Sequence, residues 1–282
     1  MIKARKRFGQ HFLEPAWVEK VVRAIDPRPD EVFLEIGPGR GALTVPLAAH
    51  AKRVIAVEID RDLVRELRAS TPPNVTVVEG DFLEMSPGWF KEALAAANAF
   101  QTIRVAGNLP YNVASPILFK LVEFFAAGLS LIDATVMLQR EVADRLTASP
   151  GTKEYGVLGI LIGHVASAER ILALPPGAFR PAPTVRSAVV ALRFHAPDPP
   201  ARRPDIFHAM VQAIFTRRRK TLANALKAFQ PCEIVPPAKV LTEAGLDGGR
   251  RPETLTITEL VRLANAFPGP GVAGARRPER PA

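Results

Sequence analysis

Residues 32–41 read VFLEIGPGRG, an apolar run followed directly by a glycine-rich turn. Its first five residues are mostly apolar, as in a strand buried within a parallel sheet. Glycines then alternate at Gly37, Gly39 and Gly41, and residues 42–49 predict a helix. A glycine-rich turn between a strand and a helix lets a ligand approach the backbone closely. A plain tight turn also uses glycines, so the stretch alone predicts an α/β unit and no particular ligand.

Acidic residues follow the next two predicted strands. Residues 53–57 end at Glu58, and residues 75–78 are followed by Asp81 and Phe82. A carboxylate about twenty residues beyond the glycines can accept both hydroxyls of a ribose. Asp81 can accept from an adenine amine and Phe82 can cover the ring, although an aspartate here is also typical of a turn or helix cap.

The spacing of the glycines limits the kinds of ligand that we expect at this turn. It differs from the G-x-G-x-x-G pattern of dinucleotide sites, and no lysine or serine follows to make a P-loop. We therefore expect an adenosine without phosphates, and S-adenosylmethionine is the common ligand of that kind.

A fourth strand, residues 103–106, leads into Asn108, Leu109, Pro110 and Tyr111. Loops at the carboxyl ends of parallel strands form the ligand-binding edge of an open sheet. The amide and carbonyl oxygens here can accept from a base amine and draw its lone pair out of conjugation, and Tyr111 can stack on the base. A turn with a structural asparagine and a packed tyrosine is the simpler alternative.

The remaining pattern predicts two domains and a tail. Residues 1–195 continue the α/β pattern, with helices at 17–25, 88–97, 115–125, 139–146 and 158–165 and strands at 133–138, 168–174 and 187–194. The proline-rich segment 175–183 presents Phe179 either as a rigid ring or as a core aromatic. Residues 196–267 predict a helical domain, with helices at 206–215, 221–229, 237–244 and 257–266, and residues 268–282 a disordered tail.

Charge and composition indicate an anionic partner. The 282 residues carry a net charge of +9, which favours nucleic acid or an anionic surface. Two basic segments can contact phosphates or be solvated surface: Arg5, Lys6, Arg7, and Arg217, Arg218, Arg219, Lys220. One cysteine excludes an internal disulfide and fits a cytoplasmic protein. The scattered histidines predict no metal site, and no apolar run is long enough to span a membrane.

Several motifs together resemble the ribosomal RNA adenine dimethyltransferases, a family that modifies two adjacent adenosines in a hairpin near the 3′ end of small-subunit (16S) RNA. The resemblance covers residues 3–267. The matching motifs are RKRFGQHFL at 5–13, EIGPG at 35–39, NLPYN at 108–112, QREV at 139–142, FRPAP at 179–183 with Val185 and SAV at 187–189, and Phe215 with RRKT at 218–221. His11 departs from the asparagine that is frequent in bacterial members.

The resemblance implies an α/β fold: a Rossmann-like S-adenosylmethionine-dependent methyltransferase domain with a small C-terminal all-helical domain that helps to hold RNA. It implies a monomer that acts on the small-subunit RNA or its precursor particle during ribosome biogenesis. It also assigns roles: Asn108 and the Leu109 carbonyl grip the target amine, and Tyr111 and Phe179 sandwich the flipped base. The cofactor site is implied at His11, Leu13, Gly37, Gly39, Glu58, Asp81, Phe82 and Asn108.

Three other functions fit parts of the sequence. The related class that methylates large-subunit RNA and confers macrolide resistance more often has isoleucine at the position of Leu109 and usually lacks a motif like residues 112–116. A DNA adenine methyltransferase would need a DNA-recognition domain, and none is visible. A non-catalytic assembly factor could keep the fold, but the intact Gly37, Glu58, Asp81 and Asn108 argue against it.

Overall fold

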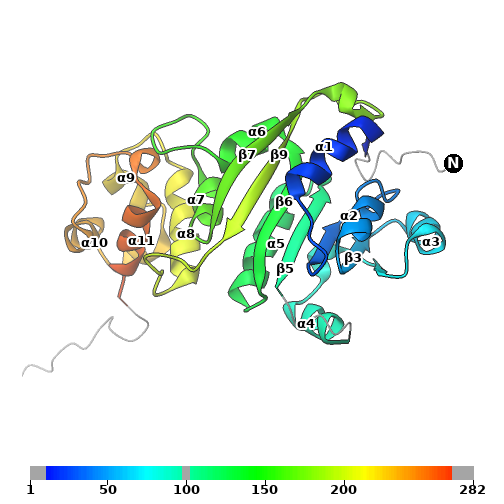
Figure 1. Cartoon of the computed structure of the whole chain (residues 1–282). Coiled ribbons are helices and arrows are strands. Elements are labelled where there is room, and N and C mark those ends of the chain that lie inside the picture. The colour runs from blue at the N-terminus through cyan, green and yellow to red at the C-terminus, as the bar shows by residue number, and fades with distance from the viewer. Residues whose placement is uncertain (1–10, 97–101, 269–282) are drawn as a thin grey trace, which may run out of the picture. The chain divides into compact units, whose positions relative to one another are not determined.

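The computed structural model describes residues 11–96 and 102–268, and Figure 1 shows their elements along the chain. The predicted basic arm at Arg5, Lys6 and Arg7 and nearly all of the predicted tail lie outside these residues. Compactness divides the described chain into a first unit, 11–96, 102–147 and 165–195, and a second unit, 148–164 and 196–268. The sequence placed 148–164 in the first domain, whereas here this segment packs with the second unit: the backbone amide of Gly151 donates to the Glu253 carbonyl at 2.7 Å.

The first unit is built on a seven-stranded sheet with the order β4-β3-β2-β5-β6-β9-β7. The ladders β4-β3, β3-β2, β2-β5 and β5-β6 are parallel, and β9 is antiparallel to both of its neighbours. The strands are β2 (Val32–Ile36), β3 (Arg53–Glu58), β4 (Val75–Glu79), β5 (Ile103–Asn108), β6 (Leu131–Gln139), β7 (Ala166–Leu174) and β9 (Ser187–Phe194).

The strand order fixes where a ligand can bind. The chain runs from β2 outward to β3 and β4, and then returns to the other side of β2 to form β5. Successive connections therefore leave β2 and β5 in opposite directions, which opens a crevice at their carboxyl ends. The Gly37 turn and Asn108 follow β2 and end β5, respectively, so both lie at this switch point.

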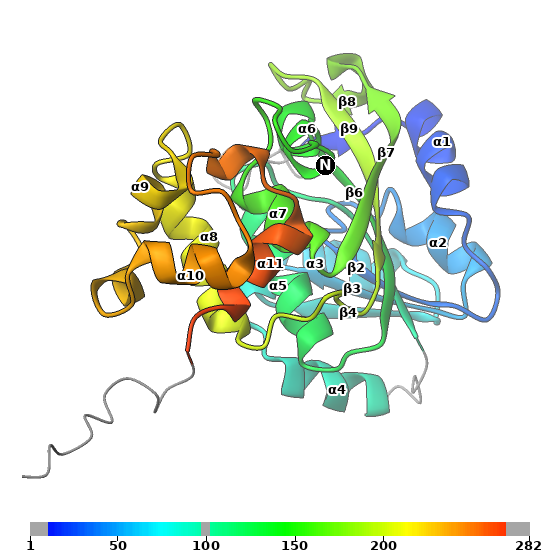
Figure 2. The same ribbon diagram turned by 90° about the vertical axis from the view of Figure 1, so that its left-hand side faces the viewer.

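Helices cover both faces of the sheet, and this explains why every residue of β2 is buried. Figures 1 and 2 agree that α1 and α2 lie on one face and α5 on the other. The helices of the unit are α1 (Pro15–Ile25), α2 (Thr44–His50), α3 (Arg61–Ser70), α4 (Pro87–Ala96), α5 (Ala114–Ala126) and α6 (Arg140–Leu146), with short 3₁₀ turns η2 (Phe82–Glu84) and η3 (Pro176–Ala178). The predicted α/β fold is confirmed.

Helix α3 was not predicted, although its signals are present in the sequence. The Asp60 side chain caps it by accepting from the Asp62 amide at 3.1 Å. Leu63, Val64 and Leu67 form its buried face, at a spacing that suits an amphipathic helix. The many charges of this segment belong to the opposite, solvated face.

A separate two-stranded sheet joins the start of the described chain to the proline-rich segment. Strand β1 (Phe12–Leu13) pairs antiparallel with β8 (Phe179–Arg180), so that Phe12 faces Arg180 and Leu13 faces Phe179. The His11 ring nitrogen Nδ1 is 2.7 Å from the Pro181 carbonyl, and the Arg180 guanidinium pairs with Glu14 at 2.9 Å. These contacts hold the segment around His11 against the segment around Phe179.

The second unit is helical, as predicted. It consists of α7 (Val157–Gly163), α8 (Pro204–Phe215), α9 (Leu222–Leu226), α10 (Pro237–Ala244) and α11 (Ile257–Asn265), with 3₁₀ turns η4 (Gln230–Glu233) and η5 (Pro252–Thr254). Figure 2 shows these helices gathered into one group. Helix α9 is shorter than the predicted 221–229. No helix in the described ranges has the length and hydropathy to cross a membrane.

Candidate active site

A cavity of about 240 Å³ lies at the carboxyl ends of β2, β3, β4 and β5. Every cofactor residue proposed from the sequence lines it, together with all four residues of the tetrapeptide: His11, Leu13, Gly37, Gly39, Glu58, Asp81, Phe82, Asn108, Leu109, Pro110 and Tyr111. Phe179 does not. The fold therefore brings the cofactor candidates and the tetrapeptide together from separate strands, whereas the Phe179 ring lies outside the cavity lining.

The glycine turn forms one wall of this cavity. Gly37 and Gly39 have positive φ angles of 68° and 61°, which non-glycine residues rarely adopt. A Cβ atom at Gly39 would lie 3.2 Å from the Phe12 ring. The Gly39 amide donates to Glu58 Oε2 at 3.0 Å, so the turn and the end of β3 are held together.

Glu58 is almost fully buried, at 6% exposure, and lies at the end of β3. Its Oε1 accepts from the Asp60 amide at 2.9 Å, while Oε2 accepts from Gly39. Burial raises the pKa of Glu58, and the backbone hydrogen bonds oppose this shift. The Ile59 backbone also hydrogen-bonds to this carboxylate, so backbone amides fill three of its roughly four acceptor sites and leave capacity for a further donor.

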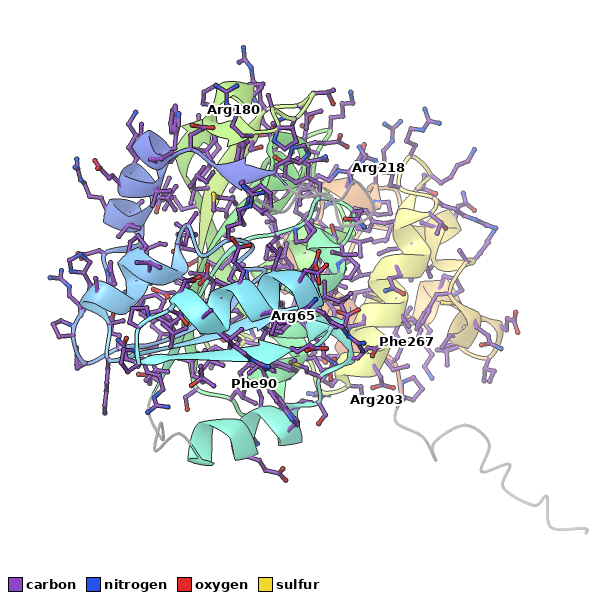
Figure 3. All side chains as sticks on the ribbon, turned by 90° about the vertical axis from the view of Figure 1, so that its right-hand side faces the viewer. Arg65, Phe90, Arg180, Arg203, Arg218 and Phe267 are labelled. Atoms are coloured by element: carbon purple, nitrogen blue, oxygen red, sulfur yellow. The ribbon has the colours of Figure 1, made fainter. Side chains whose placement is uncertain are left out.

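Two apolar side chains near Glu58 behave differently. Ile59 also lines the cavity but is 45% exposed, which is unusual for a large aliphatic side chain next to a buried strand. It was missed, although its position directly after the acidic strand end could have indicated it. Phe82 was predicted to cover an adenine, but its ring packs edge-on against Phe90 and Phe124, and Figure 3 marks Phe90.

Asp81 both caps a turn and lines the cavity, so the two roles considered from the sequence are compatible. Its Oδ1 accepts from the Leu83 amide at 2.9 Å and caps the η2 turn. The residue also lines the cavity and is only partly buried. The turn therefore fixes the carboxylate at the end of β4, where a ligand can reach it.

The Asn108 amide is oriented by the first strand segment. Its Nδ2 donates to the His11 carbonyl at 2.7 Å. Because a carbonyl oxygen only accepts, the amide must present its NH₂ group to His11 and turn Oδ1 the other way. This leaves Oδ1 as an acceptor on the side away from His11.

Two backbone features complete the tetrapeptide. The Leu109 amide donates to the Met137 carbonyl at 3.2 Å, and the Pro110 carbonyl accepts from Val113 at 3.1 Å. The Pro110 carbonyl is thus used within its own turn. Leu109 is buried and lines the cavity. Met137, which also lines the cavity from β6, was not predicted because its strand reads as uniform core.

Tyr111 stacks on His11. The ring centroids are 5.5 Å apart with an interplanar angle of 23°. The Tyr111 hydroxyl lies 2.6 Å from Ser187 Oγ, and burial raises the pKa of the phenol. The Tyr111 ring is therefore held at its hydroxyl end by a hydrogen bond, and it stacks on the ring of His11, which directly precedes β1.

Phe179 does not line the cavity in this structure. It is 1% exposed and belongs to a core cluster that includes Leu13, Met137 and Val189. The alternative interpretation, a core aromatic, describes this geometry. The reason is the β1–β8 pairing, which places Phe179 against Leu13.

Glu35 is the other buried carboxyl group at the cavity. It is 1% exposed, and its Oε2 has no hydrogen-bond partner among the described residues. Burial raises the pKa of Glu35 to about 7; the Thr44 hydroxyl lowers it and Glu58 raises it further. In the sequence it read only as part of a strand.

The four cations proposed to bind RNA in the second unit are not equivalent. Arg217, Arg219 and Lys220 are exposed. Arg218, labelled in Figure 3, instead pairs with Glu253 at 2.9 Å and donates to the carbonyls of Lys153 and Tyr155 at 3.0 and 3.3 Å. Its guanidinium therefore ties the 148–164 segment to the helices.

No three His, Cys, Asp or Glu residues in the described part of the chain gather where they could hold a metal ion.

Comparison with known proteins identifies the family of this chain. The family model "Ribosomal RNA adenine dimethylase" matches residues 1–263. The chain belongs to the ribosomal RNA adenine dimethylase family. Its members are methyltransferases that act on adenine in ribosomal RNA, and the predicted function and enzyme class are confirmed at this level.

Two relatives in this family have the name ribosomal RNA small subunit methyltransferase A. The protein of Alcanivorax borkumensis is 40% identical over 266 residues, which covers 93% of this chain and 90% of the relative. The protein of Leptothrix cholodnii is 42% identical over 264 residues, covering 93% and 91%. The recognised family resemblance is thus confirmed over nearly the whole chain.

Solved structures give the same fold. A dimethyladenosine transferase from Plasmodium falciparum aligns with a TM-score of 0.73 at 25% identity, covering 90% of this chain and 96% of that one. The 23S rRNA methyltransferase ErmE aligns with a TM-score of 0.63 at 26% identity, covering 91% and 99%. The fold is therefore shared with a dimethyladenosine transferase and with a 23S rRNA methyltransferase.

Proposed function

We propose that this protein dimethylates the N6 atoms of two adjacent adenosines in a hairpin near the 3′ end of small-subunit ribosomal RNA, with S-adenosylmethionine as the methyl donor. It acts as a monomer in the cytoplasm, on the RNA or its precursor particle during small-subunit assembly. The observation that carries the proposal is the convergence of Glu58, Asp81, Asn108 and Tyr111 on one cavity.

The residues of the cavity fit an adenosine cofactor. Glu58 keeps acceptor capacity for a ribose hydroxyl, and Asp81 offers a carboxylate to the adenine amine. The exposed Ile59 gives the base an apolar surface. The Cβ-free backbone of Gly37 and Gly39 allows close approach on the other side. When bound, S-adenosylmethionine supplies a methyl group that is activated by the positive charge on its sulfur.

Asn108 and Leu109 act on the target amine. The lone pair of adenine N6 is shared with the ring, which makes it a poor nucleophile. Asn108 Oδ1 and the Leu109 carbonyl accept its two hydrogens and draw the lone pair out of conjugation. Such positioning is worth up to roughly 7–11 kcal/mol. The amine becomes acidic as the new bond forms, so its proton leaves without a strong base.

Tyr111 holds the flipped base by stacking. The His11 ring already lies 5.5 Å from the Tyr111 ring, which is one stacking distance. A base cannot enter between two rings at this separation unless one of them moves. Phe179 packs in a core cluster with Leu13 and Val189, so its proposed stacking role requires its ring to leave that cluster.

Methylation of large-subunit RNA is the second candidate, because the ErmE structure covers 91% of this chain. The identities of about 40% to small-subunit enzymes, against 26% to ErmE, favour the first candidate. Leu109 and residues 112–116 favour it as well.

The test is a direct assay with radiolabelled donor on three unmodified substrates: small-subunit particles, large-subunit RNA and duplex DNA. Primer extension then locates the label. We expect label only in small-subunit RNA, on two adjacent adenosines. Label in large-subunit RNA or in DNA would contradict the proposal and identify that nucleic acid as the substrate. Binding of small-subunit particles without any transfer would favour the non-catalytic assembly factor.

A further inference from the structure

Two exposed arginines, Arg140 and Arg186, are chain neighbours of a residue pair next to Tyr111. The Tyr111 hydroxyl contacts Ser187 Oγ at 2.6 Å, and Ser187 pairs with Gln139 in the β6–β9 ladder. Arg186 directly precedes Ser187, and Arg140 directly follows Gln139. The Arg140 amide donates to the Arg186 carbonyl at 2.9 Å, so both backbones are fixed next to the aromatic ring.

Nearby carboxylates form close ion pairs with other arginines, but the positive charges of Arg140 and Arg186 are weakly paired or unpaired in the described part of the chain. The neutralised cations have close partners: Arg145 with Glu141, Arg170 with Asp144 at 2.8 Å, and Arg180, labelled in Figure 3, with Glu14 at 2.9 Å. Arg140 reaches Asp144 only at 3.5 Å, and its side chain is 53% exposed. Arg186 is exposed and makes no ion pair with any carboxylate in the described ranges.

Weak or absent pairing keeps these two guanidinium groups available. An exposed ion pair such as Arg140–Asp144 contributes about 0–1 kcal/mol and is easily exchanged. A guanidinium presents a planar fork of donors that matches a phosphate in two-point contact. The guanidinium groups of Arg140 and Arg186 are thus suited to bind phosphate.

The substrate places phosphates at this position. A nucleotide that flips into the cavity remains joined to its strand through the phosphates on either side of it. These phosphates must stay at the mouth of the base pocket while the base stacks on Tyr111. Cations adjacent to that ring are therefore close to the strand whatever its sequence.

We propose that Arg140 and Arg186 bind the RNA phosphates that flank the flipped adenosine. This inference rests on the proposed function, since it takes RNA as the substrate. The two residues hold the strand in register over the cavity and read no base. Their contribution is electrostatic and depends on salt.

The test compares Arg186→Gln and the double variant Arg140→Gln/Arg186→Gln with the matched control Arg193→Gln. Arg193 is exposed and lies near the other end of the same strand, β9, about 20 Å from Arg186 at the usual rise per residue. The probe is an RNA hairpin with two adjacent adenosines in its loop. Its affinity is measured over a range of salt concentrations, alongside S-adenosylmethionine affinity and thermal unfolding.

We expect the double variant to bind the hairpin about tenfold or more weakly near 0.1 M salt. The slope of log affinity against log salt should fall by about 0.7–0.9 per arginine removed. S-adenosylmethionine affinity and Arg193→Gln should match wild type. If the double variant unfolds, the exposed Arg186→Gln alone carries the test.

Unchanged affinity and slope in the folded variants would overturn the proposal. An equal loss in Arg193→Gln would also overturn it, because the effect would then reflect net charge alone. Failure of the wild type itself to bind or methylate the hairpin would instead contradict the proposed function, so the two failures are distinguishable.

Discussion

The side-chain amide of Asn108 donates to the backbone carbonyl of His11 at 2.7 Å, across 97 positions of sequence. This bond turns Asn108 Oδ1 away from His11. It also means that the end of β5 and the segment before β1 are positioned together. In the proposed reaction, the acceptor for the target amine is therefore set by a residue outside the tetrapeptide.

Asn108→Asp tests this orientation. Aspartate keeps the size of the side chain but cannot donate to the His11 carbonyl when ionised. We expect methyl transfer to fall by about a hundredfold, the loss typical of a misplaced reactive group. The matched control is Asn74→Asp, which breaks amide donations to Ala48 and Ala51 at 2.8 and 3.1 Å. The control should lower stability and leave turnover of the folded enzyme unchanged. Equal turnover in Asn108→Asp and wild type would contradict the orientation role.

Glu35 should make the stability of the ligand-free protein depend on pH. Its pKa is raised from 4.5 to about 7, so the folded protein holds a proton that the unfolded chain releases between these values. The free energy of unfolding should therefore fall as pH rises from about 4.5 to 7, by up to roughly 3 kcal/mol from this group.

Glu35→Gln removes this titration. Denaturant unfolding at a series of pH values should show that the difference between wild type and variant grows in favour of the variant up to about pH 7 and then levels off. Because Glu58 also has a raised pKa, the difference, and not the wild-type curve alone, isolates Glu35. A difference that does not change with pH would show that Glu35 titrates normally.

Phe179→Leu distinguishes packing from stacking. In the core position, the smaller leucine removes packing contacts, and it should cost about 1–2 kcal/mol of stability and leave methyl transfer near wild type. Tyr111→Leu is the comparison, and loss of base stacking there should reduce kcat/KM for RNA by roughly tenfold or more. If Phe179→Leu lost activity to the same extent with unchanged stability, the base-sandwich role implied by the family resemblance would be correct and the buried position would be one state of the loop.

Arg218 and Arg219 should separate structure from RNA binding. Arg218→Gln leaves Glu253, whose side chain is 18% exposed, without its partner, and should lower the free energy of unfolding by roughly 2 kcal/mol. Arg219→Gln should change stability little, because Arg219 is exposed, and should instead reduce the salt dependence of RNA binding. The reverse pattern, with Arg218 affecting only the salt slope, would show that its contacts with Lys153 and Tyr155 are dispensable.

The sequence predicts the cavity because its parts come from regular βα units. Parallel strands end at one edge, so Gly37, Glu58, Asp81 and Asn108 could be assigned to neighbouring positions from strand order alone. Their carboxylates and amide also follow strands whose apolar runs are unambiguous.

The features that escaped prediction depend on contacts between distant segments. Strands β1 and β8 have two residues each, too few to show any periodicity, and their pairing decides that Phe179 is buried. Residues 148–164 belong to the second unit, and Arg218 contacts this segment through the Lys153 carbonyl. A run of four adjacent cations does not indicate in the sequence that one of them makes internal contacts. Ring pairing between His11 and Tyr111 likewise follows from tertiary structure.

The most direct measurement is mass spectrometry of small-subunit ribosomal RNA from cells that lack this gene, complemented with wild type or with Asn108→Ala. The account predicts two adjacent N6,N6-dimethyladenosines with wild type, and unmodified adenosines both without the gene and with a stably produced Asn108→Ala protein. Dimethylation that persists without the gene, or that Asn108→Ala restores, would contradict it.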